Sequence, residues 1–359
     1  MTLVNLHKTP FPWFGGKADA APAVWSAIGD VDHYVEPFAG SLAVLLRRPH
    51  EANRTYHSET VNDLDGLLCN AWRAIARDPD AVAEAASWPV VEADLMARHL
   101  ALVAWRAGGA VERLSADPDY YDARMAGWWV WGQSCWIGSG WCSGTGPWIV
   151  GADGRITKRH KGGGVHRKCP HVSDDGMGVN HAGTREPGVG EPDYHPMTMP
   201  ELSRWLRFLS ARLRHVRVLN GSWERAVTSG VLKTITVRGG KGKAGIFLDP
   251  PYSDEVRTGG LYAHDSGTVA ADARAWCLAH GADPDYRIVL AGYDTEHAAM
   301  ESHGWTTVEW YRTGHLKGGM SNQSAQGTQQ HRERLWLSPH CLRPDAVVAR
   351  QGSIFGGGR

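Results

Sequence analysis

The sequence predicts an α/β protein whose parallel sheet is interrupted by an inserted module. Strands alternate with helices over the first 110 residues, which is typical of βαβ units. The same alternation returns after about residue 201. Between them, residues 138–191 are crowded with Gly, His, Ser and Pro and show little periodicity. Because 359 residues correspond to about two domains of ~150 residues, we expect the following division: a discontinuous α/β domain at 1–110 and 201–345, an inserted region at 111–200 and a flexible tail at 346–359.

The first part contains two predicted strands, each followed by a helical pattern. His33 to Val35 predicts a short strand, and helical periodicity follows from Ser41 to Arg48. Thr55 to Asn62 predicts a second strand that ends at Asp63. The next helix is expected from Leu67 to Ala76, where one face is apolar. This order predicts parallel neighbours in one sheet.

The second part continues the same alternation. Its expected helices are Leu202 to Leu213 and Val269 to His280. Its expected strands are Val216 to Leu219, Ala244 to Leu248, Arg287 to Ala291, Thr306 to Tyr311 and Arg334 to Leu337. The strand at Ala244 to Leu248 is uniformly apolar, which predicts burial on both faces.

Composition excludes several classes of protein. With 42% hydrophobic and 21% charged residues the chain is neither disordered nor collagenous. Its longest apolar runs, such as Leu42 to Leu46, are far shorter than the ~20 residues of a membrane helix. The first residues do not form a secretory signal, so we expect a cytoplasmic protein without a membrane partner. The six cysteines form no C-x-x-C pair, and we expect reduced thiols and no metal.

Charge is balanced overall but not locally. Lys plus Arg and Asp plus Glu are both 38, so a nucleic-acid site would need local segregation of charge. Residues 154–173 contain six Lys/Arg and no acid. Two interpretations stay open for this stretch, a solvated loop or a loop that contacts phosphates. Its candidate DNA contacts are Lys158, Arg159, Lys161, Arg167 and Lys168.

A strand-to-helix turn is expected at Glu36-Pro37-Phe38-Ala39-Gly40. Glycine lets a ligand approach the backbone, and a following helix N-terminus would favour an anionic group. Neither the G-x-G-x-x-G of dinucleotide sites nor the G-K-[ST] of a P-loop is present there. The turn therefore suits a cofactor with a carboxylate rather than phosphates; the alternative is an ordinary tight turn.

An acid follows the second predicted strand, and an acid with two prolines follows the buried strand at Ala244 to Leu248. Asp63 is placed to accept hydrogen bonds from ribose hydroxyls, or alternatively to cap the next helix. Asp249-Pro250-Pro251-Tyr252 brings a carboxylate, outward-facing carbonyls and a ring to a strand end. Such a set suits a planar heterocycle with an exocyclic amino group.

Near the N-terminus, the string FPWFGGK contains Trp13 and Lys17. Aromatic rings, a glycine pair and a cation could close over the carboxylate end of a cofactor. By itself the string also fits a plain N-terminal turn. It supports a cofactor site only together with the other motifs and their order along the chain.

This order of motifs resembles the Dam-like DNA adenine-N6 methyltransferases. The resemblance rests on FPWFGGK, YVEPFAGS, the acid after the second strand, an insertion and FLDPPYS, and it covers roughly residues 9–110 and 200–342. Downstream strings such as Val289-Leu290-Ala291-Gly292-Tyr293 and Glu333-Arg334-Leu335-Trp336 resemble its phage-borne branch. The resemblance implies a Rossmann-like methyltransferase fold, S-adenosylmethionine as cofactor and double-stranded DNA as substrate. It implies a site-specific, adenine-specific enzyme.

The resemblance also implies roles for residues at matching positions. Trp13 and Lys17 would close over the cofactor, and Glu36 with the turn Pro37, Phe38, Ala39 and Gly40 would hold its methionine and ribose portions. Asp63 would bind the ribose hydroxyls. Asp249 and Pro250 would accept hydrogen bonds from the adenine amino group, and Tyr252 would stack on the flipped base. The sequence departs from related proteins at Ser222, where they often have an acid that holds the adenine ring of the cofactor.

Several alternatives remain at this stage. Cytosine presents a similar amino group, so cytosine-N4 methylation is the nearest alternative, and a catalytically inactive relative that masks DNA sites is another. Of 17 tryptophans, six lie between 128 and 148; most are expected in the core of the inserted module, with Trp136 and Trp141 as candidates to face DNA. A restriction endonuclease encoded elsewhere is a candidate partner.

Overall fold

We describe the protein from a computed structural model. The structure describes residues 9–11, 13, 15–49, 58–136, 141–142, 148–150, 156–158, 199–232, 236–237, 240–251, 268–310 and 333–342. Tyr311 and Thr55 to His57, at the ends of two expected strands, lie outside these ranges.

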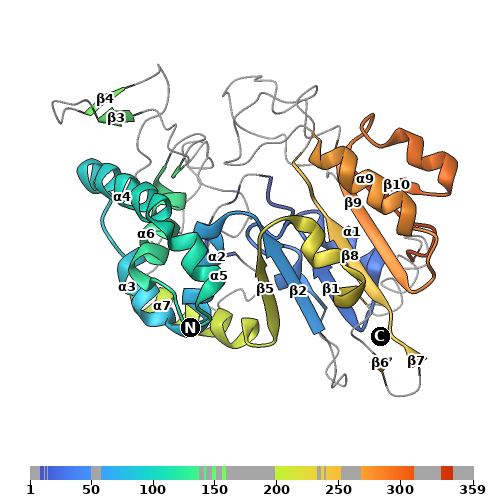
Figure 1. The fold of residues 1–359 in the computed structure, drawn as a ribbon, viewed down its shortest axis with the longest axis horizontal. Helices are drawn as coiled ribbons and strands as arrows, with labels where there is room; N and C mark the ends of the chain where they lie inside the picture. Colours follow the sequence, from blue (N-terminus) through green and yellow to red (C-terminus); the bar gives the residue numbers. More distant parts are fainter. Residues whose placement is uncertain are drawn as a thin grey trace, which may run out of the picture.

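A seven-stranded sheet forms the centre of the molecule (Figure 1). Its order is β10-β11-β9-β8-β1-β2-β5. The five strands from β9 to β5 are parallel, β11 is antiparallel to β9, and β10 is antiparallel to β11. This confirms the predicted α/β class and is consistent with a Rossmann-like methyltransferase fold. The strands are β1 (His33–Glu36), β2 (Ser58–Asp63), β5 (Val216–Asn220), β8 (Ala244–Leu248), β9 (Tyr286–Tyr293), β10 (Thr306–Val308) and β11 (Glu333–Leu337).

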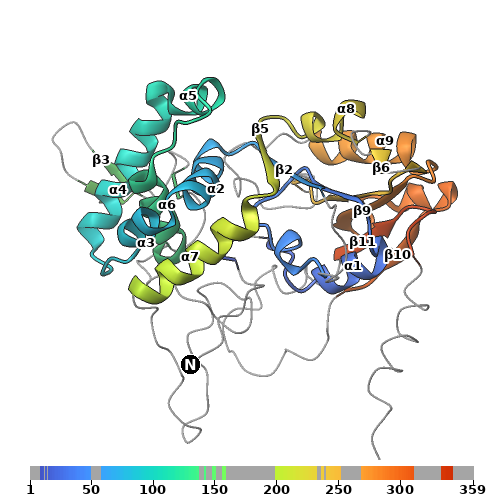
Figure 2. The same ribbon diagram turned by 90° about the horizontal axis from the view of Figure 1, so that it is seen from below.

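β8 is buried on both faces, as its apolar sequence predicts, and β1, which contains His33 and Glu36, is buried on both faces as well. Successive side chains alternate between two hydrophobic clusters. Phe247 of β8 joins one cluster, whereas its neighbours Ile246 and Leu248 join the other. Helices cover both faces: α1 (Ala21–Ile28) lies on one side, and α8 (Ser229–Leu232) and α9 (Val269–His280) lie on the other (Figure 2). Two short 3-10 helices, η3 (Trp223–Val227) and η4 (Ala298–His303), complete this part.

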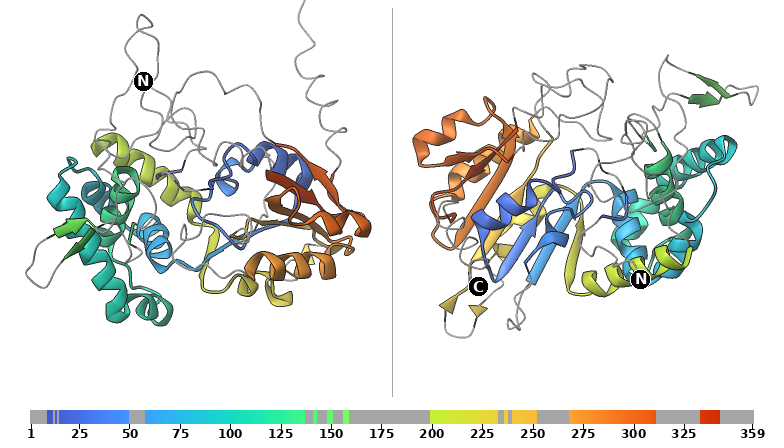
Figure 3. Two further views of the ribbon diagram at one scale, coloured as in Figure 1. Left: turned by 90° about the horizontal axis from the view of Figure 1, so that it is seen from above. Right: turned by 180° about the vertical axis from the view of Figure 1, so that it is seen from behind.

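A group of helices lies beyond the β5 edge of the sheet (Figures 1 and 3). We call the group α3 to α7 the helical layer; α6 packs on α3, α2 and α4, and α7 packs on α3 and α2. The proposed boundary at residues 110/111 falls next to a kink at Gly109, which has a φ of +85° and lies within η2 between α4 and α5. The members and the adjoining helix are α2 (Gly66–Arg77), α3 (Pro79–Ala86), α4 (Glu92–Trp105), η2 (Arg106–Ala110), α5 (Val111–Ala116), α6 (Ala123–Cys135) and α7 (Met199–Leu213).

Two small antiparallel pairs complete the described elements. They are β3 (Trp148–Val150) with β4 (Ile156–Lys158), and β6 (Thr236–Val237) with β7 (Gly240–Lys241). Among the described residues, no helix combines the length and the apolar character needed to span a bilayer.

The helix predicted from Ser41 to Arg48 does not form, and this prediction was wrong. The segment is a series of turns that ends in a short 3-10 helix, η1 (Leu45–Arg47). Leu42 has a φ of +59°, in the left-handed region that an α-helix cannot continue through. The backbone N–H of Leu45 donates to Glu36 Oε2 at 3.2 Å instead of joining a helical ladder.

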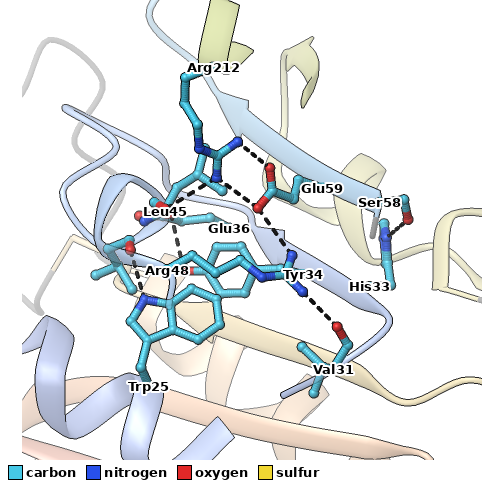
Figure 4. Close-up of polar contacts among 11 residues, drawn as sticks. Trp25, Val31, His33, Tyr34, Glu36, Leu45, Arg48, Ser58, Glu59 and Arg212 are labelled. Atoms are coloured by element: carbon cyan, nitrogen blue, oxygen red, sulfur yellow. Dashed lines mark hydrogen bonds and ion pairs between the residues drawn. The ribbon is translucent and has the colours of Figure 1, made fainter. Parts of the chain in front are cut away.

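A buried ion network joins α7 to the sheet (Figure 4). Glu59 of β2 accepts from Arg48 Nη1 at 3.1 Å and from Arg212 of α7 at 2.6 and 2.8 Å. Arg48 also donates to the carbonyl of Val31 at 2.6 Å. All three charged side chains are at most 11% exposed, so the contact fixes the position of α7 against the first two strands.

Candidate active site

The reversal of strand order lies between β1 and β8. From β1 the chain proceeds outward through β2 to β5, and from β8 it proceeds the other way through β9. Ligands of open α/β sheets bind outside the carboxyl ends of the strands at such a switch point. Glu36 ends β1 and Asp249 follows β8, so two residues predicted from sequence flank this point.

A small hollow opens at that position. It joins three of the segments predicted from sequence: the N-terminal string, the turn after β1 and the end of β8. Its lining residues are Trp13, Gly15, Gly16, Lys17, Glu36, Phe38, Ala39, Gly40, Ser41, Ala43, Phe247 and Asp249. Segments far apart in the sequence therefore meet at one edge of the sheet.

Gly40 is the pivot of the turn after β1. Its φ of +46° is unfavourable for residues with a side chain, and a Cβ there would lie 2.5 Å from Trp13 Nε1. Glycine thus allows the Trp13 indole to lie directly on the turn. The Gly40 carbonyl accepts from Trp72 Nε1 at 3.2 Å, which anchors the turn to α2.

Asp63 is joined to the same turn. Its Oδ2 accepts from the Gly40 backbone N–H at 2.9 Å, and its Oδ1 accepts from the Asp65 N–H at 2.9 Å. Burial raises the pKa of the Asp63 carboxyl to about 6, although these backbone donors act in the opposite direction. The helix-capping alternative does not apply to Asp63, because Asp65 is the N-cap of α2 and accepts from the Leu67 N–H at 2.9 Å.

Glu36 is less exposed than Asp63. Only 3% of its side chain is exposed, and its Oε2 accepts from the Tyr34 hydroxyl and from the Leu45 N–H, each at 3.2 Å. Burial raises the pKa of Glu36 well above its usual range. Both hydrogen bonds hold the turn in shape, so Glu36 supports the floor of the hollow.

Lys17 makes the central ionic contact of the site. Its Nζ lies 3.0 Å from Asp249 Oδ1, donates to the Gly15 carbonyl at 3.0 Å and lies 3.8 Å from Glu333 Oε2. The Lys17 side chain is 5% exposed. The N-terminal string thus contacts the acid of the Asp249 motif directly. Sequence reasoning did not select Glu333, because its approach depends on antiparallel pairing of Glu333 with Tyr293 of β9.

Aromatic rings extend the site towards β5. Phe38 stacks on Trp223 with ring centroids 5.8 Å apart and an interplanar angle of 27°. Ser222, the position that departs from related proteins, precedes Trp223 and donates to the carboxylate of Glu224. An acid is therefore present near this strand end, two residues later than expected.

The remaining predicted residues of the active site and of the basic stretch are only partly described by the structure. Pro250 is buried and Pro251 is half-buried beside Asp249, and Pro37 and Ala39 belong to the turn after β1. Tyr252, Arg159, Lys161, Arg167 and Lys168 lie outside the described residues, and for Lys158 only the backbone is described, in β4.

Trp136 is a core residue, contrary to the expectation that it faces DNA. It is 7% exposed and stacks on His99 of α4, with ring centroids 5.1 Å apart. Trp141 is half-buried; its indole lies over Gly132 of α6, and its Nε1 donates to the Trp129 carbonyl at 3.2 Å. Both rings pack against helices of the helical layer, where burial of their large apolar surface is stabilising.

Comparison with known proteins agrees with this arrangement. Residues 13–93 match the model of the D12 class N6 adenine-specific DNA methyltransferases. The match covers the Trp13 and Lys17 string, the turn after β1, and Asp63. No protein with a curated description matches the chain. This match and the sheet topology support the predicted assignment to the Dam-like N6 adenine-specific DNA methyltransferases, a family of enzymes.

Proposed function

We propose that the protein transfers a methyl group from S-adenosylmethionine to the N6 amino group of an adenine that is flipped out of duplex DNA. The observation that supports this most strongly is the ionic contact between Lys17 and Asp249 at the switch point of the sheet. Through this contact the N-terminal string and the Asp249 motif, which are far apart in the chain, line the same hollow.

The residues present suit this cofactor. Exposed Gly15 and Gly16 leave the rim of the hollow without side chains, and the Gly40 turn offers backbone close by. Asp63, which is hydrogen-bonded to the Gly40 turn, would accept from ribose hydroxyls, and the Phe38 ring would offer a stacking surface. When bound, the cofactor supplies an electrophilic methyl group on a cationic sulfur.

The chain's own groups would prepare the amino group for transfer. Asp249 and the Pro250 carbonyl would accept hydrogen bonds from its two N–H groups, which would draw the nitrogen lone pair out of conjugation and aim it at the methyl group. Lys17 fixes the Asp249 carboxylate in place through its 3.0 Å contact. Much of the rate gain then comes from alignment of the two reactants. Stacking on Tyr252 would return roughly 1–3 kcal/mol of the cost of unstacking the base.

Recognition of DNA is assigned by this proposal to the inserted region at residues 111–200. The basic stretch around Lys158 would contact phosphates. Such an enzyme would work in the cytoplasm of a bacterium or phage-infected cell, where a restriction endonuclease of the same specificity could accompany it.

The test is identification of the methylated base. Purified protein is incubated with duplex DNA and S-adenosylmethionine that has a labelled methyl group, and digested nucleosides are analysed by mass spectrometry. The proposal expects label in N6-methyladenine, and none with Asp249→Ala, while calorimetry shows cofactor binding by that variant within several-fold of wild type. Label in N4-methylcytosine would show a cytosine enzyme, and cofactor-independent DNA binding without label would show an inactive relative.

A further inference from the structure

A third charged residue, Glu333, belongs to the ionic contact of the active site. It begins β11, which runs antiparallel to β9, so its position is at the same sheet edge as the end of β8. Its carboxylate is 14% exposed, and its Oε2 lies 3.8 Å from Lys17 Nζ. Burial raises the pKa of Glu333, with Lys17 acting against this rise and Asp249 adding to it. Glu333 therefore interacts with both members of the Lys17–Asp249 pair.

One ammonium group thus lies between two carboxylates. Lys17 is 5% exposed and Asp249 is 19% exposed, so solvent screens these charges weakly. Because Coulomb attraction falls with the inverse of distance, Glu333 at 3.8 Å competes with Asp249 at 3.0 Å for the same ammonium. Lys17 is consequently shared between the two carboxylates.

This sharing matters for the chemistry of the proposed function, on which the inference rests. An acceptor bound in a full, buried ion pair attracts a further N–H donor less strongly than one that shares its cation.

We propose that Glu333 is a positioning residue for methyl transfer. It draws the Lys17 ammonium partly away from Asp249, so that Asp249 stays a strong acceptor for the adenine amino group. Glu333 acts through Lys17 and does not touch the substrate. Its removal is expected to slow the chemical step while leaving the affinity for the cofactor nearly unchanged.

The test measures the single-turnover rate constant at saturating enzyme and cofactor, which isolates the chemical step from product release. For Glu333→Gln, which preserves shape and removes charge, we expect a loss of roughly ten- to hundredfold, as is typical of residues that orient a reacting group. Glu333→Asp keeps the charge and should lose less. The KM for DNA and the Kd for S-adenosylmethionine should stay within about threefold, whereas a merely structural role would move all of them.

Two controls make the test specific. Glu309→Gln removes a carboxylate from the same corner of the sheet, where Glu309 is 74% exposed and pairs with Arg334 at 2.9 Å, and it should leave the rate unchanged. In a Lys17→Met background, Glu333→Gln should have little further effect, because the shared cation is gone.

The outcomes separate this inference from the proposed function. A wild-type protein that methylates adenine and a Glu333→Gln variant with an unchanged single-turnover rate would overturn the inference alone. A full loss that persists in the Lys17→Met background, or an equal loss in Glu309→Gln, would overturn it as well. A wild-type protein without methyl transfer would instead contradict the proposed function.

Discussion

Replacement of Gly40 by alanine tests whether the turn after β1 positions Trp13 over the site. Gly40 has a φ of +46°, where an L-residue costs about 1–2 kcal/mol. The new Cβ would also lie 2.5 Å from Trp13 Nε1 and 2.9 Å from its Cδ1, so the indole must move. Trp13 would then lose its contacts with the rings of Phe11 and Trp129, each at 6.1 Å between centroids. Two aromatic pairs at about 0.5–1.5 kcal/mol each add about 1–3 kcal/mol.

The expected total for Gly40→Ala is therefore a loss of about 2–5 kcal/mol in the free energy of unfolding. Gly304→Ala is the matched control. Gly304 has a φ of +81°, but the nearest atom to a Cβ there is 3.5 Å away, so this variant shows backbone strain without a clash. Gly108→Ala, with no atom within 4 Å of the new Cβ, should change little.

Urea denaturation measures the three losses, and titration calorimetry measures affinity for S-adenosylmethionine. Gly40→Ala should weaken cofactor binding by about tenfold, which corresponds to about 1.4 kcal/mol, whereas Gly304→Ala should bind as wild type does. The reasoning is refuted if the two variants lose equal stability and both bind the cofactor normally. In that case Trp13 would not depend on Gly40 for its position.

Three further outcomes are expected. The pKa of Asp63 is raised to about 6, and the ribose hydroxyls would donate to its ionised carboxylate. Cofactor affinity measured by calorimetry should therefore fall as the pH drops through about 6. The Asp63→Asn variant, which cannot ionise, should show no such fall. Glu59→Gln leaves two buried arginines without their shared carboxylate and should cost about 3–5 kcal/mol in urea denaturation. Asp80→Asn, which breaks an exposed pair with Arg207, should cost much less, and equal losses would mean that burial does not matter here. Replacing Lys158, Arg159 and Lys161 together by alanine should weaken the salt dependence of DNA binding. In binding titrations, the slope of log affinity against log salt concentration should become shallower by about 0.9 for each lost phosphate contact, while the methylated sequence stays the same. An unchanged slope would identify the stretch as a solvated linker.

Local patterns were sufficient to predict the sheet. The strand at Ala244 to Leu248 and the helix at Val269 to His280 form with the expected bounds, because runs of apolar residues and helical periodicity report directly on burial. Proximity of Trp13, Lys17, Glu36 and Asp249 followed from the family resemblance rather than from any local pattern.

Other features depend on contacts that no local pattern contains. The segment after Gly40 has helical periodicity, yet Leu42 is left-handed because the buried Glu36 takes the Leu45 N–H. Glu333 comes to Lys17 through antiparallel pairing with β9. Trp136 is buried because His99 from a separate helix offers a flat ring to stack on. In each case the deciding partner is distant in sequence.

Methylation of adenine through Asp249 can be tested by long-read sequencing of DNA from methylation-deficient cells that express the protein. We expect N6-methyladenine at a recurring short sequence with the wild-type chain, and unmodified DNA with Asp249→Ala at equal expression. N4-methylcytosine in place of N6-methyladenine, or the same methylated sites with Asp249→Ala, would contradict it.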